Sequence, residues 1–129
     1  MNNIIKVDTD NVSFRNYLGT LTPVLKRMYS FGFRIHRAEV YNTKNGYHIY
    51  YQLNNNVNFE STIILELLLG NDKLRSVYTY FEGKDILFKR KKNVLRKKNK
   101  YLTTKLNNYL NVLGKYYVDN NYIKAVVTF

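Results

Sequence analysis

The chain has 129 residues, 45% of them apolar and 16% aromatic, which is enough for one domain with a buried core. Cysteine is absent, which excludes disulfides and thiolate metal sites, and no apolar run approaches the roughly 20 residues that a membrane span needs. With 21 basic against 9 acidic residues the net charge is +12, and a field of this sign attracts polyanions. We therefore expect one intracellular, cytoplasmic domain over residues 1–129 that does not bind a membrane.

The chain begins with a predicted strand and a predicted helix. Residues 4–10 alternate as a strand does, and this alternation places Asp8 and Asp10 together on the side opposite the apolar residues. Apolar residues then recur at helical spacing over 13–31. Pro23 leaves two alternatives, because it is compatible with one kinked helix or with the first position of a second helix.

A β-hairpin is the clearest local signal. The segments 34–41 and 47–53 are rich in β-forming residues and are separated by a loop that ends in Asn45-Gly46, a strong turn sequence. On the second strand, alternation places His48 and Tyr50 on the face opposite the larger apolar set.

Two short helices and a fourth strand complete the predicted core. Asn58 can cap a helix that ends at Gly70, Asp72 can cap another that ends at Gly83, and residues 85–90 read as a strand. The apolar stripes expected to face the core are Phe59, Ile63, Ile64, Leu67 and Leu68 in the first helix, and Leu74, Val77, Tyr78 and Phe81 in the second.

With the two short helices taken as one helical segment, the predicted order is β-α-β-β-α-β. This is the order of an α+β, ferredoxin-like (RRM-like) fold, in which helices cover one face of an antiparallel sheet and leave the other face for a ligand. We assign this core to residues 1–90. Residues 91–129 form an extension with a basic helix over 94–113 and a C-terminal β-hairpin.

A basic strip runs from Lys84 to Lys105. It holds ten basic residues and one acid, Asp85, and so carries +9 of the net charge of +12. A solvated helix face would normally mix the two signs, so phosphate contacts explain the strip better. The residues expected to bind nucleic acid are Lys44, Tyr50, Lys89, Arg90, Lys91, Lys92, Arg96, Lys97, Lys98 and Lys100.

Tyrosines gather on the predicted hairpin, at positions 41, 47, 50 and 51. Tyrosine rings can stack on unpaired bases, whereas the alternative role is core packing. Strand alternation assigns about half of the four to the core. Tyr50 shares the face of His48 and is the best candidate for stacking.

Asp8, Asp10 and His48 are the candidate catalytic residues. Two close carboxylates can hold Mg²⁺ or Mn²⁺, and an imidazole beside them can contact a phosphate or relay a proton. In a ferredoxin-like sheet the strands that carry them are adjacent, and Asp85 could complete the metal site. The alternative is that the two aspartates only cap the following helix and that His48 is a surface residue.

The order of these residues resembles the motifs of the archaeo-eukaryotic primase-polymerase superfamily. That family has a hydrophobic-Asp-x-Asp motif, a Ser-Gly-x-Gly-x-His-like motif and a third acid in an RRM-like catalytic module, which Asp8 and Asp10, the segment 43–48 and Asp85 resemble. The resemblance spans residues 4–90 and implies that the three acids bind divalent metal and that His48 contacts nucleotide phosphate. The first glycine of the histidine motif is missing, and the third motif is displaced. The chain also resembles, more weakly, the rolling-circle replication initiators. Those proteins have a His-hydrophobic-His motif, of which His48-Ile49-Tyr50 supplies only the first histidine.

Together these features predict a nucleic-acid-binding protein, with single-stranded or template DNA favoured, that serves replication of a virus or plasmid and acts in the host cytoplasm if viral. Such binding requires no cofactor. One alternative is a reduced primase, nucleotidyl transferase or nuclease that uses Mg²⁺ or Mn²⁺. The other is a non-enzymatic interaction protein or homodimer that pairs through the apolar C-terminal hairpin, residues 116–129.

Overall fold

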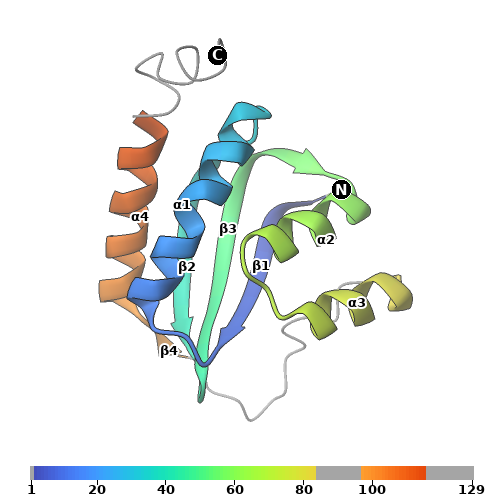
Figure 1. The fold of residues 1–129 in the computed structure, drawn as a ribbon, viewed down its shortest axis with the longest axis horizontal. Helices are drawn as coiled ribbons and strands as arrows, with labels where there is room; N and C mark the ends of the chain where they lie inside the picture. The colour runs from blue at the N-terminus through green and yellow to red at the C-terminus, as the bar shows by residue number, and fades with distance from the viewer. Residues whose placement is uncertain (1, 84–96, 116–129) are drawn as a thin grey trace.

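The computed structural model describes residues 2–83 and 97–115 and confirms the α+β class (Figure 1). These residues form four strands in one antiparallel sheet and four helices. In chain order the elements are β1 (Asn2–Asp10), α1 (Phe14–Ser30), β2 (Ile35–Asn42), β3 (Gly46–Val57), α2 (Phe59–Leu68), α3 (Lys73–Glu82), β4 (Lys97–Lys98) and α4 (Lys100–Gly114). The predicted strand 85–90 and the predicted hairpin 116–129 lie outside the described residues.

The strand order of the sheet is β1-β3-β2-β4. Both β1 and β2 pair antiparallel with β3, so they run in the same direction with β3 between them, as in a split βαβ unit. The fourth described strand, β4, pairs with β2 at the edge away from β1. A ferredoxin-like sheet instead places its fourth strand beside β1, so the described strands do not give the complete order that the sequence predicts.

The hydrophobic core lies between the sheet and its helices. Strand alternation directs Val7, Val40, Ile49 and Tyr51 to one face of the sheet, where they are fully buried. Helices α1 and α2 lie over the sheet in Figure 1. Further strand residues and the helices α1, α2 and α4 supply most of the rest of the core cluster. The hydroxyl of Tyr51 lies 2.7 Å from that of Tyr17, which in turn donates to the Leu69 carbonyl at 2.6 Å, and burial raises the pKa of both phenols.

Helix α1 is a single helix that continues through Pro23. Of the two alternatives predicted for Pro23, the start of a second helix is therefore wrong. Its N-cap is Ser13, whose hydroxyl accepts a hydrogen bond from the Asn16 N–H at 3.2 Å. The chain leaves the helix through Gly32, which has a φ of +89° that favours glycine. Neither Asp8 nor Asp10 caps this helix, so that alternative role for the acidic pair is wrong.

Helix α4 closes the outer edge of β2 with polar side chains. The amide of Asn107 accepts from the Ala38 N–H at 2.9 Å and donates to the Ala38 carbonyl at 2.8 Å. The Thr103 hydroxyl accepts from the Val40 N–H at 3.0 Å, and the Asn99 N–H donates to the Val40 carbonyl at 2.8 Å. The helix therefore satisfies backbone groups that a neighbouring strand would otherwise pair.

The predicted start of this helix at residue 94 is wrong. Asn99 is the N-cap and accepts from the Leu102 N–H at 2.9 Å, so α4 begins at Lys100. The two residues before the cap, Lys97 and Lys98, form β4 because they pair with the end of β2. The helix packs on the core through Leu106, Leu110 and Leu113, which are buried.

Replacing Asn107 by Leu should lower the free energy of unfolding by about 2 kcal/mol, because both backbone groups of the buried Ala38 would lose their partner. Urea unfolding followed by circular dichroism measures the loss. Asn108→Leu is the matched control, since Asn108 is the next residue of the same helix and is exposed. Equal losses in the two variants would contradict the edge-closing role of Asn107.

Helices α2 and α3 have the predicted N-caps, Asn58 and Asp72, and α3 ends before Gly83 as predicted, whereas α2 ends at Leu68, two residues before the predicted Gly70. The predicted core face of α3 is wrong. Its apolar stripe, at positions 74, 77, 78 and 81, is 44% to 79% exposed, whereas Ser76 and Thr79 are buried. Hydrogen bonds explain this orientation: Asn71 accepts from the Asp8 N–H at 2.7 Å and donates to the Ser76 hydroxyl at 2.6 Å. Polar contacts with the end of β1 thus decide which side of α3 faces inward.

Helix α2 also exposes part of its predicted stripe. Ile63 is buried as expected, but Ile64, Leu67 and Leu68 are 41% to 57% exposed. Leu65 and Glu66 are buried in their place. The two helices therefore present several apolar side chains to solvent.

Candidate nucleic-acid interface

The face of the sheet opposite the core carries two tyrosines in contact. The rings of Tyr41 and Tyr50 meet edge to face, with centroids 5.4 Å apart and planes at 76°. Tyr51 is fully buried on the other face, and Tyr47 packs against Phe14 with ring centroids 5.5 Å apart. The predicted division of these tyrosines by strand alternation is confirmed. We call the surface that carries Lys6, Arg37, Glu39, Tyr41, His48 and Tyr50 the tyrosine face.

Basic side chains surround the two rings. Lys6 pairs in register with Tyr50, and Lys98 pairs in register with Tyr41. Residues directly opposite in an antiparallel pair point to the same side, and the 3.8 Å separation of the Lys98 ammonium from the Glu39 carboxylate agrees with this placement. Arg37 donates to the Gln52 amide oxygen at 2.8 Å on the same surface. Strand β4 thus brings Lys98, which belongs to the basic strip, to the tyrosine face.

Part of this face forms a hollow of about 390 Å³ beside Tyr50. Lys6, Arg37 and Tyr50 line it, together with Glu39 and Gln52. Its walls combine an aromatic ring, two cations and an amide, which are the groups that proteins use to stack a base and to contact the neighbouring phosphates.

Of the residues that the sequence singles out for nucleic acid, Tyr50 and Lys98 lie on the tyrosine face. Lys44 is exposed at the hairpin tip, and Lys97 and Lys100 are exposed on either side of the α4 N-cap. The predicted contacts Lys89, Arg90, Lys91, Lys92 and Arg96 lie outside the described residues. Lys6 and Arg37 were not predicted, although the alternation that places Asp8 on this face places Lys6 there too.

Asp8 is the centre of a polar cluster at one end of the tyrosine face. It pairs in register with His48, as predicted, and its Oδ1 lies 3.4 Å from His48 Nε2. Its Oδ2 accepts from Arg75 Nε at 2.8 Å, and its side chain is only 4% exposed. The Asp8 carbonyl accepts from the Asp72 N–H at 3.0 Å, so the cluster joins β1 to the start of α3. Arg75 was not predicted, because nothing in the helix pattern relates it to β1.

The described residues do not assemble the metal site that the primase resemblance implies. Both oxygens of Asp8 already face cationic or imidazole nitrogens, of Arg75 and His48, whereas Asp10 is exposed. Within residues 2–83 and 97–115, no group of three or more histidine or acidic side chains is placed to hold an ion. Asp85 lies outside this part of the chain. The Asp8 carboxylate thus acts as a partner for Arg75 in this arrangement.

Asp8 and Asp10 should respond oppositely to replacement by Asn. Loss of the charged hydrogen bond to Arg75 should make Asp8→Asn less stable by about 1–2 kcal/mol. Partial burial, and next the charge of Asp8, raise the pKa of Asp10, so ionised Asp10 opposes folding once the pH exceeds the usual carboxyl range.

Asp10→Asn should therefore match or exceed the parent in stability at pH 7, and the difference should vanish as the pH falls below that range. Urea unfolding at a series of pH values measures both effects. A loss in Asp10→Asn as large as that in Asp8→Asn would show that the two carboxylates have the same structural role, contrary to this account.

Comparison with family models, with curated proteins and with solved structures finds no match to this chain. No helix in the described ranges combines the length and the apolar content that crossing a membrane requires.

Proposed function

We propose that the protein binds single-stranded nucleic acid across the tyrosine face. The observation that carries the proposal is the pairing of β2 with β4, which places Lys98 of the basic strip directly opposite Tyr41. Tyr41 touches Tyr50, and Lys6 and Arg37 lie on the same surface. Aromatic side chains stack on bases of any sequence, and the surrounding cations position the phosphates.

Electrostatics supports the same assignment. A chain of net charge +12 attracts a polyanion from a distance, and each phosphate that a lysine or arginine neutralises releases condensed counterions. Unpaired bases are needed for stacking, so a single strand fits this surface better than a duplex does. No cofactor is required for binding of this kind.

The ferredoxin-like arrangement and a role in replication of a viral or plasmid genome are part of the proposal. The order β1-β3-β2 and the split βαβ unit support the first. The resemblance to primases supports the second. We propose no metal-dependent step, because Arg75 engages the Asp8 carboxylate.

Fluorescence anisotropy tests this function with labelled single-stranded DNA, single-stranded RNA and duplex DNA of one sequence. We expect binding to one or both single strands, weaker binding to the duplex, and a logarithm of the binding constant that falls linearly with the logarithm of salt concentration. No binding at low salt, or binding without a salt slope, would reject the proposal.

A further inference from the structure

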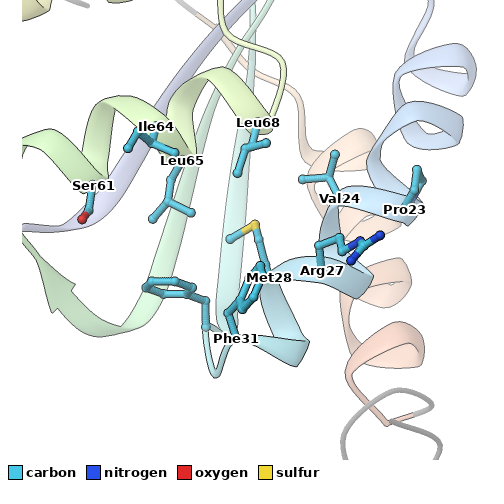
Figure 2. Close-up of a pocket in the computed structure, with 10 residues that line it drawn as sticks. Pro23, Val24, Arg27, Met28, Phe31, Ser61, Ile64, Leu65 and Leu68 are labelled. Atoms are coloured by element: carbon cyan, nitrogen blue, oxygen red, sulfur yellow. The ribbon is translucent and has the colours of Figure 1, made fainter. Parts of the chain in front are cut away.

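A second surface lies on the helical side of the molecule, between α1 and α2. Figure 2 shows the side chains of the two helices on either side of a groove. The groove has a volume of about 440 Å³ and is lined chiefly by Val24, Met28 and Phe31 on one side and by Ile64, Leu65 and Leu68 on the other. Phe31, Ile64 and Leu68 are 50% to 75% exposed, which is unusual for large apolar side chains gathered in one place.

We propose that this groove binds one amphipathic helix of a partner protein, with apolar anchors on one face and acidic residues at its rim. The α2 wall runs from Ser61 to Leu68, which is about two turns of helix. A bound helix of matching length would place apolar side chains at positions i, i+3 or i+4, and i+7 into the groove. A groove between two helices is a common receptor for such a segment.

Charge selects the acidic partner over a second copy of this chain. Among the residues of 2–83 and 97–115 that line the groove, Arg27 alone is charged. A second copy would bring another net charge of +12 and another Arg27 to the same surface, and both would oppose association. An acidic rim would instead pair with Arg27 and be attracted by the whole chain.

The groove is independent of the proposed nucleic-acid surface. Its helices cover the core face of the sheet, whereas Tyr41 and Tyr50 lie on the opposite face. The protein is therefore able to hold a strand on one face and a partner helix on the other. Loss of one activity does not entail loss of the other.

The test uses a synthetic helical peptide of about 14 residues, with Leu or Phe at i, i+3, i+4 and i+7 and Glu elsewhere. The full chain contains only two methionines, so ¹³C-methyl labelling of Met reports on Met28 in the groove, with Met1 as an internal reference. We expect the peptide to bind and to shift the Met28 methyl signal alone. A scrambled peptide of the same composition should not bind.

Ile64→Glu should weaken peptide binding at least about tenfold, because the bound peptide would bury an uncompensated charge. Ile64 is 57% exposed, so the fold should persist. The matched control is Val112→Glu on α4, where Val112 is 65% exposed and does not line the groove. Arg27→Glu should weaken binding of the acidic peptide, because the one basic side chain that lines the described part of the groove would become acidic.

Three outcomes would overturn the proposal. Equal binding of the scrambled peptide would show general attraction to a basic protein. A Met28 shift that depends on protein concentration alone, with a doubled mass in light scattering, would identify a second copy as the occupant. Absence of peptide binding, together with a lower stability of Ile64→Glu in the isolated chain, would mean that the chain's own residues fill the groove.

Discussion

Replacing Gly46 by Ala should lower the free energy of unfolding by about 3 kcal/mol or more, because the added methyl group has no space. A Cβ at this position would lie 1.9 Å from the Thr9 carbonyl oxygen and 2.8 Å from the Asp10 Cα. Both atoms belong to the backbone of β1, which pairs with β3 at this point. The ladder must therefore open at the pair formed by Asp10 and Gly46, two residues along the strands from the pair formed by Asp8 and His48.

Gly19 provides the control, with an effect of the opposite sign. It lies inside α1, and a Cβ there would meet nothing within 4 Å. Gly19→Ala should raise the stability by about 1 kcal/mol, since alanine loses less conformational freedom in a helix. Urea unfolding of both variants measures the contrast. A Gly46→Ala protein as stable as the parent would show that the two strands are not this close.

Replacing Tyr41 and Tyr50 together by Ala should weaken single-strand binding by about 2 kcal/mol or more, roughly thirtyfold, because each ring is placed to stack on a base. The fold should persist, since both rings lie outside the core cluster. The matched control removes Tyr78 and Tyr101, which are 57% and 73% exposed on α3 and α4. Anisotropy titrations at one salt concentration measure the difference. If both double variants lose the same binding free energy, bases do not stack on Tyr41 and Tyr50.

Local signals in the sequence were enough for much of the fold. Caps at Ser, Asn and Asp residues and the Asn45-Gly46 turn act over a few residues, and the helices and the hairpin begin and end near them. Periodicity failed for α3, whose inward side is polar. Asn71 and Ser76 fix that side through hydrogen bonds to distant backbone, and an apolar pattern contains no information about such bonds.

In the candidate site too, features set by local sequence were predicted, and features set by contacts between distant segments were not. Alternation along two strands correctly predicted that Asp8 and His48 share a face, because adjacent strands follow from the split βαβ order. Arg75 could not be predicted, since its contact with Asp8 depends on where α3 lies against the end of β1. The position of Lys98 beside Tyr41 depends on a two-residue strand that starts inside a segment predicted to be helical.

The most direct test of the tyrosine face is the salt dependence of single-strand binding after Lys6, Arg37 and Lys98 are replaced together by Ala. Loss of three phosphate contacts should reduce the slope of log binding constant against log salt by about 2. The control replaces Arg15, Lys73 and Lys115 by Ala. These residues are exposed outside the tyrosine face, and their replacement lowers the net charge by the same amount. We predict an unchanged or slightly reduced slope for the control and the full reduction for the first variant. The same slope in both variants would contradict binding at the tyrosine face and leave only the general attraction of a basic protein.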